Sequence, residues 1–425
     1  MYISKIALKN IRGFESLEFD LDRGNGEFAG WTVFTGNNGS GKSTLLKAVA
    51  FCIAPFDAKP LLQSDFSYFL RVNPAGQKTE IFLNLASVAV DDDLPESLSD
   101  PKMVPYQAVL FRGGGSMSSV GVLSLQEHLR DPLIGLHGWF SCGYGPFRRI
   151  TPPKENVEQI QKTKDAERFA TLFLEGATLS EVDPWLTKLR FQELEGSRDA
   201  GEQLASFLSL VRDSLLPNGF SVERVDSNGL WLKDPEGVEL SWFDMSDGHR
   251  AAVALVADIV RHMIFTYGLE GLYDRDEAGK IFIKRSGVVL IDEIDAHLHP
   301  SWQREIGFWL KRHFPKVQFL VTSHSPIILQ AADPNGLFVL PEPGSGDAPR
   351  PLSAEEYQNI VASRPNSILR SPAFGLQNTA SEPVVENRAR YSRLQSKKRA
   401  GAKLSPTEEK ELQVLVPSIS VDDEE

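Results

Sequence analysis

The sequence predicts an α/β protein in which helices flank a mixed β-sheet. Segments with the apolar or alternating pattern of strands recur along the chain, and segments with the 3.6-residue period of helices lie between them. A glycine-rich turn joins one predicted strand directly to a helix, a connection that is common in α/β proteins. With 425 residues, the chain is long enough for two or three domains, or for one large domain with insertions.

Residues 1–150 are predicted to form the N-terminal half of the α/β domain. Residues 2–8 and 31–35 have the composition of strands, and apolar residues alternate along 81–85. The predicted strand at 31–35 runs into the glycine-rich turn, and a helix with one apolar face follows.

Residues 151–218 are predicted to form a helical insert. Five apolar residues recur at the spacing of a helix with one buried face: Leu204, Phe207, Leu208, Val211 and Leu215. Strand signals return after this segment, so residues 219–340 are predicted to form the C-terminal half of the α/β domain. Residues 341–425 are expected to form a small C-terminal helical extension, in which Ser405 and Glu408 fit a capping box.

Composition limits the function classes. The net charge of -12 argues against a general nucleic-acid coat protein, although a local basic groove stays open. The two cysteines imply no disulfide framework, and therefore a reducing compartment. No signal region and no apolar run of the roughly 18 residues that a membrane helix needs is found. We therefore expect a cytoplasmic protein with no membrane partner.

The glycine-rich turn matches the phosphate-binding motif G-x-x-x-x-G-K-[ST] in full. Its residues are Gly36, Asn37, Asn38, Gly39, Ser40, Gly41, Lys42 and Ser43, and Thr44 follows them. Glycines let backbone N–H groups point inward around phosphate oxygens, and the helix start adds the positive end of a dipole. Lys42 would reach the β- and γ-phosphates, and the Ser43 hydroxyl would hold Mg²⁺. The motif predicts ATP binding; a glycine turn without a ligand is the alternative.

A second acidic element lies far downstream. Residues 288–291 form a short, fully apolar segment that ends in Asp292 and Glu293. Buried carboxylates need a partner, and Mg²⁺ supplies one for Asp292. Glu293 is then placed to orient or deprotonate the attacking water. The alternative, an ordinary acidic turn after a core strand, does not account for the phosphate motif upstream.

A third motif opens a predicted helix. Its residues are Ser246, Asp247, Gly248, His249 and Arg250. A serine at a helix start beside glycine makes a second anion cradle. The segment resembles the signature motif of ABC ATPases, although Met245 and Asp247 replace its usual Leu and first Gly. The resemblance implies a P-loop NTPase of the ABC-ATPase type and a head-to-tail dimer, in which Ser246 and Gly248 close on a γ-phosphate held by the other copy.

Three further segments are similar to the RecF, SMC and OLD families within the ABC ATPases. Residues 294–300 resemble a D-loop, which we favour over a metal site made by Asp295, His297 and His299. Residues 319–326 resemble the last core strand and its switch histidine, which implies that His324 contacts the γ-phosphate. Residues 8–14 resemble the first strand of RecF and SMC proteins, which implies that Arg12 lies near the nucleotide base. No glutamine is assigned to the Q-loop.

The resemblance also implies a function. Ser246 and Asp292 lie about twice as far apart in sequence as the matching residues of transporter motors, which argues against that class. The run from Leu290 to Ala331 and the tail at 368–376 are most similar to the ATPase subunit of Septu systems and to retron-associated ATPases. We therefore expect an ATP-dependent switch in bacterial antiphage defence.

The expected partner in that role is a separate HNH-type nuclease. OLD-type relatives carry a nuclease after the ATPase that needs roughly a hundred residues, and fewer remain here after the α/β domain. A RecF-like role in DNA repair is the alternative, with DNA as the partner. Its best local support is the basic segment 388–403, which could also be a solvated helix face.

Overall fold

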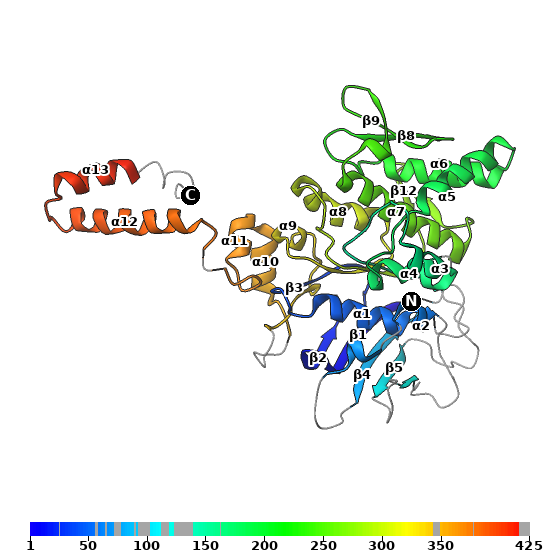
Figure 1. Ribbon diagram of the computed structural model, residues 1–425, viewed down its shortest axis with the longest axis horizontal. Helices are drawn as coiled ribbons and strands as arrows, with labels where there is room; N and C mark the ends of the chain where they lie inside the picture. Colours follow the sequence, from blue (N-terminus) through cyan, green and yellow to red (C-terminus); the bar gives the residue numbers. More distant parts are fainter. Residues whose placement is uncertain are drawn as a thin grey trace. The chain divides into compact units, whose positions relative to one another are not determined.

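The computed structural model divides the chain into two compact units, Met1–Ser363 and Arg364–Glu425 (Figure 1). It describes residues 1–24, 26–55, 58–63, 66–71, 78–88, 91, 103–111, 119–122, 139–161, 163–342, 349–376 and 378–415. No helix among these described residues is long and apolar enough to cross a membrane.

A largely parallel sheet forms the centre of the first unit. In the described part of the chain its strand order is β16-β15-β3-β14-β13-β7, and β16 alone among these runs antiparallel to its neighbour. The strands are β3 (Gly30–Thr35), β7 (Ser141–Tyr144), β13 (Gly287–Ile291), β14 (Val317–Thr322), β15 (Leu337–Val339) and β16 (Arg350–Pro351). Every residue of β13 and β14 is buried, as expected for parallel strands covered on both faces.

A second sheet is antiparallel, with the order β2-β1-β4-β5-β6 over the described strands. Its strands are β1 (Tyr2–Ile11), β2 (Phe14–Asp20), β4 (Thr79–Ala86), β5 (Met103–Phe111) and β6 (Ser119–Val122). The predicted α/β class with a mixed sheet and flanking helices is confirmed. The division into two sheets was not predicted, because alternation within a strand does not show which strands pair.

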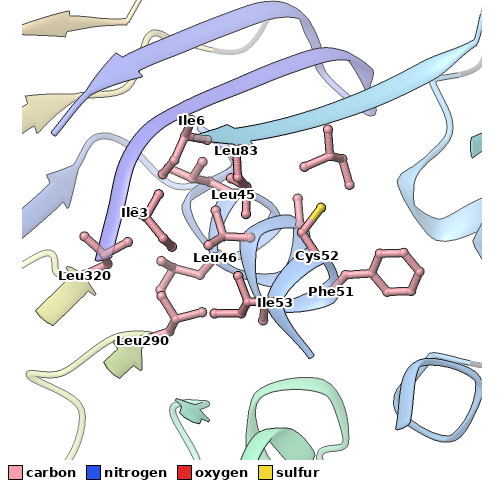
Figure 2. Packing of buried hydrophobic residues seen from close by; sticks show 14 of the residues in the cluster. Ile3, Ile6, Leu45, Leu46, Phe51, Cys52, Ile53, Leu83, Leu290 and Leu320 are labelled. Carbon is pink, nitrogen blue, oxygen red and sulfur yellow. The ribbon is translucent and has the colours of Figure 1, made fainter. Parts of the chain in front are cut away.

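Helix α1 (Lys42–Ile53) joins the two sheets into one core. Leu45 and Leu46 of α1 meet Ile6 of the antiparallel sheet on one side and Leu290 of β13 on the other, as Figure 2 shows. Nearly the whole circumference of α1 is buried, which explains why the helix is apolar on more than one face. The packing fixes the start of α1, where the phosphate motif lies.

Helices fill the segment between β7 and β8. They are α3 (Glu155–Gln161), α4 (Lys164–Phe173), α5 (Val182–Leu194) and α6 (Arg198–Arg212), with α5 and α6 drawn in green in Figure 1. Helix α4 packs on β7, and α5 and α6 pack on each other and on a small sheet. That sheet holds β8 (Ser221–Asp226), β9 (Gly229–Lys233) and β10 (Glu239–Ser241).

The first unit contains further short elements and helices. The short ones are α2 (Lys59–Leu62), the 3₁₀ turns η2 (Phe66–Phe69) and η3 (Trp242–Asp244), and the paired strands β11 (Tyr273–Arg275) and β12 (Ile281–Ile283). The helices are α7 (Asp247–Tyr267), α8 (Pro300–His313), α9 (Pro326–Leu329) and α10 (Ala354–Ala362).

The second unit contains α11 (Pro365–Leu369), α12 (Glu382–Arg399) and α13 (Pro406–Leu415). Helices α12 and α13 lie side by side as a hairpin around Leu394, Leu412 and Leu415 (Figure 1). The predicted capping box is confirmed: the Glu408 N–H donates to Ser405 Oγ at 3.2 Å, and the Ser405 N–H donates to the Glu408 carboxylate at 2.8 Å.

Candidate nucleotide-binding site

The phosphate loop spans the gap between β3 and α1. Gly36, Gly39 and Gly41 have φ values of 146°, 79° and 87°, a region that favours glycine. A Cβ atom on Gly41 would lie 2.1 Å from the ring of Phe14. The loop therefore needs glycine both for its backbone conformation and for the close approach of Phe14.

Lys42 lies inside the curve of this loop. Its Nζ donates to the carbonyl oxygens of Gly36 at 2.9 Å and Asn37 at 3.0 Å. Burial lowers the pKa of Lys42, while the negative charge of Asp292 acts in the opposite direction. Lys42 is thus a buried cation that loop carbonyls hold at the cavity wall, where it can reach a phosphate.

The loop opens onto a cavity of about 870 Å³, which is within the usual size range of ligand pockets. The predicted site residues that line it are Arg12, Asn38, Gly39, Ser40, Gly41, Lys42, Ser43, Thr44, Glu293 and His324. Gly36 and Asn37 lie outside this lining, and the Asn37 amide donates to the Glu342 carboxylate at 2.7 Å.

Asp292 and Glu293 follow β13, and Thr322 at the end of β14 holds them together. The Thr322 hydroxyl donates to Asp292 Oδ1 at 2.6 Å and accepts from the Glu293 N–H at 2.8 Å. Asp292 is only 3% exposed, whereas Glu293 lines the cavity. Burial and the neighbouring charges of Asp292 and Asp295 raise the pKa of Glu293, which favours proton uptake by this carboxylate.

His324 follows β14, which lies between β3, the strand before the phosphate loop, and β13, the strand before Glu293. Burial and the positive charge of Lys42 lower the pKa of His324. The imidazole is therefore neutral at neutral pH, and one ring N–H remains available as a donor at the cavity wall.

Arg148 is a further functional candidate, and it lies outside the sequence motifs. Its buried guanidinium donates to the carbonyl oxygens of Gly145, Asp292, Glu293, Ile294 and Ala296 at 2.8–3.2 Å. Burial lowers the pKa of Arg148 to about 10. One side chain thus fixes the backbone of the turn that carries both acidic residues, a role that only the tertiary structure reveals.

Another part of the cavity lining is aromatic and basic. Arg12 has a positive φ of 44°, and its guanidinium lies 4.4 Å from the ring centroid of Tyr68. Tyr68 and Arg71 also line the cavity, although no motif predicted them. The wall offers stacking surfaces and positive charge, which suit a nucleobase and its sugar phosphate.

The signature residues lie elsewhere. Ser246 is exposed at the start of α7, and neither Ser246 nor Gly248 lines the phosphate cavity. A Cβ atom on Gly248 would lie 2.6 Å from the His297 carbonyl oxygen, so the start of α7 packs directly on the predicted D-loop. Residues of the phosphate loop, Glu293 and His324 thus line one cavity within a single chain, whereas Ser246 and Gly248 lie outside that cavity.

The predicted D-loop is held by its own side chains. The Ser323 hydroxyl donates to Asp295 Oδ1 at 2.6 Å, which ties the turn to the segment that carries His324. His299 forms the N-cap of α8 and accepts from the Ser301 N–H at 3.3 Å. Asp295 and His299 thus have hydrogen-bond partners within the protein, which is consistent with a structural turn at this position.

A family model described as "AAA domain, putative AbiEii toxin, Type IV TA system" matches residues 31–330, which include the phosphate loop, the acidic pair and the signature segment. The chain belongs to this family. Membership in this AAA family agrees with the nucleotide site that the geometry indicates.

Curated relatives of this AAA protein are similar at low identity. It is 26% identical to Septu protein PtuA of Bacillus mycoides (strain KBAB4), over 89% of this chain and 45% of that protein. It is 26% identical to the Retron Ec83 probable ATPase of Escherichia coli, over 85% of this chain and 77% of that protein. The chain therefore spans less than half the length of PtuA. An Smc head domain derived from Pyrococcus furiosus superposes at a TM-score of 0.49 and 17% identity, over 85% of this chain and 98% of that one.

Proposed function

We propose that this chain binds ATP and hydrolyses it to ADP and phosphate. The observation that carries the proposal is the convergence of Lys42, Glu293 and His324 on one cavity. They lie after three neighbouring parallel strands: Lys42 after β3, His324 after β14 and Glu293 after β13. The carboxyl ends of these strands meet at one edge of the sheet. The cavity thus combines a cation that can bind phosphate (Lys42), a carboxylate that can act as a base (Glu293) and a neutral hydrogen-bond donor (His324).

Ser43 and Asp292 fit Mg²⁺ bound with the nucleotide. Both supply oxygen ligands, and Mg²⁺ in such sites takes one or two protein ligands together with phosphate oxygens and water. When bound, the ion would neutralise charge on the phosphates. The Thr322 hydroxyl donates to Oδ1 of Asp292 and not to Oδ2, so the second carboxylate oxygen can act as a ligand of the ion.

In the proposed reaction Glu293 orients the attacking water and accepts its proton. Its raised pKa suits this role, because the carboxylate holds a proton more readily than an exposed one does. Lys42 binds the β- and γ-phosphates, and His324 donates a hydrogen bond to the γ-phosphate. Arg12 lies beside the nucleobase of the bound ATP.

The active form is proposed to be a head-to-tail dimer. Ser246 and Gly248 would act on the nucleotide of a second copy, which is supported by the exposure of Ser246 and by its place outside its own cavity. ATP would hold the two copies together, and hydrolysis would release them.

The biological role that we favour is an ATP-dependent switch in antiphage defence that controls a separate HNH-type nuclease. The similarity to Septu PtuA and to the Retron Ec83 probable ATPase supports this role. A RecF-like, DNA-binding role is the second candidate. It is supported by the exposed basic residues Arg390, Arg393, Lys398 and Arg399 of α12.

Replacement of Lys42 by Ala tests the nucleotide site. We expect Lys42→Ala to weaken ATP binding at least tenfold and to abolish hydrolysis, because the charge that faces the phosphates is lost. Calorimetric titration with ATP and a phosphate-release assay measure both effects. Lys47→Ala is the matched control, since Lys47 lies on the same helix beside Tyr68 and does not line the cavity. Unchanged ATP affinity in Lys42→Ala would contradict the proposal.

Copurification separates the two biological roles. Tagged Glu293→Gln protein, purified with ATP from the native host, should retain a nuclease at a fixed ratio. Recovery of DNA with repair proteins and without a nuclease would favour the RecF-like role instead.

A further inference from the structure

The serine at the start of α7 is held in an unusual way. A serine at this position ordinarily accepts a hydrogen bond from a backbone N–H in the first helical turn. The Ser246 hydroxyl makes no such capping bond. Its Oγ lies 2.7 Å from Nδ1 of His249 instead. The Ser246 hydroxyl therefore interacts with the His249 imidazole and does not cap the helix.

Packing fixes the orientation of this ring. The ring centroid of His249 lies 5.1 Å from that of Phe220 and 5.8 Å from that of Trp302. Trp302 is itself fixed, because its Nε1 donates to the Leu215 carbonyl oxygen at 2.6 Å. Nε2 of His249 is buried and has no hydrogen-bond partner among the described residues. The aromatic contacts thus hold the ring so that Nδ1 faces Ser246.

The position of the ring proton decides what Ser246 can do. A buried N–H group without an acceptor is rarer in native structures than a buried acceptor without a donor. The unpartnered Nε2 is therefore the unprotonated nitrogen, and the proton is on Nδ1. Burial and the nearby His299 lower the pKa of His249, so the ring carries this single proton. Nδ1 donates to the Ser246 oxygen, and the Ser246 O–H proton remains free.

We infer that His249 is a positioning residue that holds the Ser246 oxygen and turns its hydroxyl proton outward, toward the γ-phosphate of a nucleotide bound by a second copy. The inference rests on the proposed dimer, because Ser246 does not line the cavity of its own chain. If Ser246 donated to the ring instead, its oxygen would present only lone pairs to a phosphate oxygen and would repel it. His249 thereby sets the direction of the hydrogen bond.

Variants of His249 separate the hydrogen bond from the packing. His249→Phe keeps an aromatic ring against Phe220 and Trp302 but removes the donor. His249→Asn loses most of the ring, yet its amide nitrogen lies near the position of Nδ1 and can donate. Both are made in Glu293→Gln protein, and the dissociation constant of the ATP-bound dimer is measured by sedimentation.

We expect His249→Phe and Ser246→Ala each to weaken the dimer at least tenfold, and His249→Asn to stay within about threefold of the parent. The double variant with both His249→Phe and Ser246→Ala should be no weaker than either single variant, because both remove one shared interaction. ATP affinity of the monomer should not change, since neither residue lines the cavity. Ser246→Ala is at an exposed position and is not expected to disturb folding, so it gives the effect of losing the hydroxyl alone. If His249→Phe fails to fold, the comparison of His249→Asn with Ser246→Ala replaces it: a dimer as weak in His249→Asn as in Ser246→Ala would overturn the inference.

The inference is overturned if His249→Phe dimerises as tightly as the parent, if His249→Asn is as weak as His249→Phe, or if the two single effects multiply in the double variant. A Glu293→Gln parent that stays monomeric at saturating ATP would instead remove the proposed dimer, and this inference with it.

Discussion

At the residue scale, the acidic turn after β13 depends on side chains outside the recognised motifs. Thr322 bonds both to the Asp292 side chain and to the Glu293 backbone. The Arg148 guanidinium donates to the carbonyl oxygens of Asp292 and Glu293 in the same turn. Glu293 has a positive φ of 46°, which an ordinary residue adopts only where its surroundings impose it. The position of Glu293, the proposed catalytic base, therefore depends on contacts of the surrounding backbone.

We predict that Arg148→Lys lowers kcat for ATP hydrolysis at least tenfold and lowers the free energy of unfolding by about 1–3 kcal/mol. A lysine keeps the charge, but it lacks the planar fork that satisfies these carbonyl oxygens together. ATP affinity should stay close to that of the parent, because Arg148 does not line the cavity. Steady-state kinetics and urea denaturation measure the two effects.

Arg149→Lys is the matched control for this change. Arg149 is the next residue, is exposed, and lies beside the ring of Phe147. It should change stability by less than about 0.5 kcal/mol and leave kcat unaltered. If Arg148→Lys behaved like Arg149→Lys, the assigned role of Arg148 would be wrong.

The phosphate loop and the acidic pair could be predicted because each is a short motif that acts through local backbone geometry. Tyr68, Arg71 and Arg148 could not be predicted as site residues. Each reaches the site from a segment without a motif, and its contacts depend on the tertiary structure.

At the scale of elements, strands with apolar patterns were predictable, and β7 was not. Strand β7 is short and contains Ser141, Cys142 and Gly143, yet it pairs with β13 in the core. A Cβ atom on Gly143 would lie 2.8 Å from a methyl group of Leu172 on α4. Small residues are needed here because α4 packs closely on the strand. These small residues do not give the apolar or alternating pattern by which a strand is predicted.

The capping box of α13 gives a prediction at this scale. Ser405→Ala should destabilise the α12–α13 hairpin by about 1 kcal/mol, because the Glu408 N–H loses its acceptor. Amide hydrogen exchange along α13 should accelerate by about fivefold. Thr407→Ala, at an exposed position on the same helix, is the control and should leave exchange almost unchanged. Equal exchange rates in the two variants would show that the capping box contributes nothing.

At the scale of the whole molecule, strand order explains how distant motifs meet. Strand β14 lies between β3 and β13, so His324 falls between Lys42 and Glu293 although the three are far apart in sequence. The same arrangement leaves the start of α7 outside the cavity, packed on the predicted D-loop. The proposed site with two anion cradles would therefore need a second copy of the chain.

The mass of Glu293→Gln protein in solution, measured with and without ATP and Mg²⁺, tests this requirement most directly. The carboxamide cannot accept the proton of the attacking water, so hydrolysis stops while ATP binding through Lys42 persists. We predict a dimer with ATP and a monomer without it, and a monomer in both conditions for the Lys42→Ala, Glu293→Gln double variant. A Glu293→Gln protein that binds ATP at saturation and remains monomeric would contradict the account.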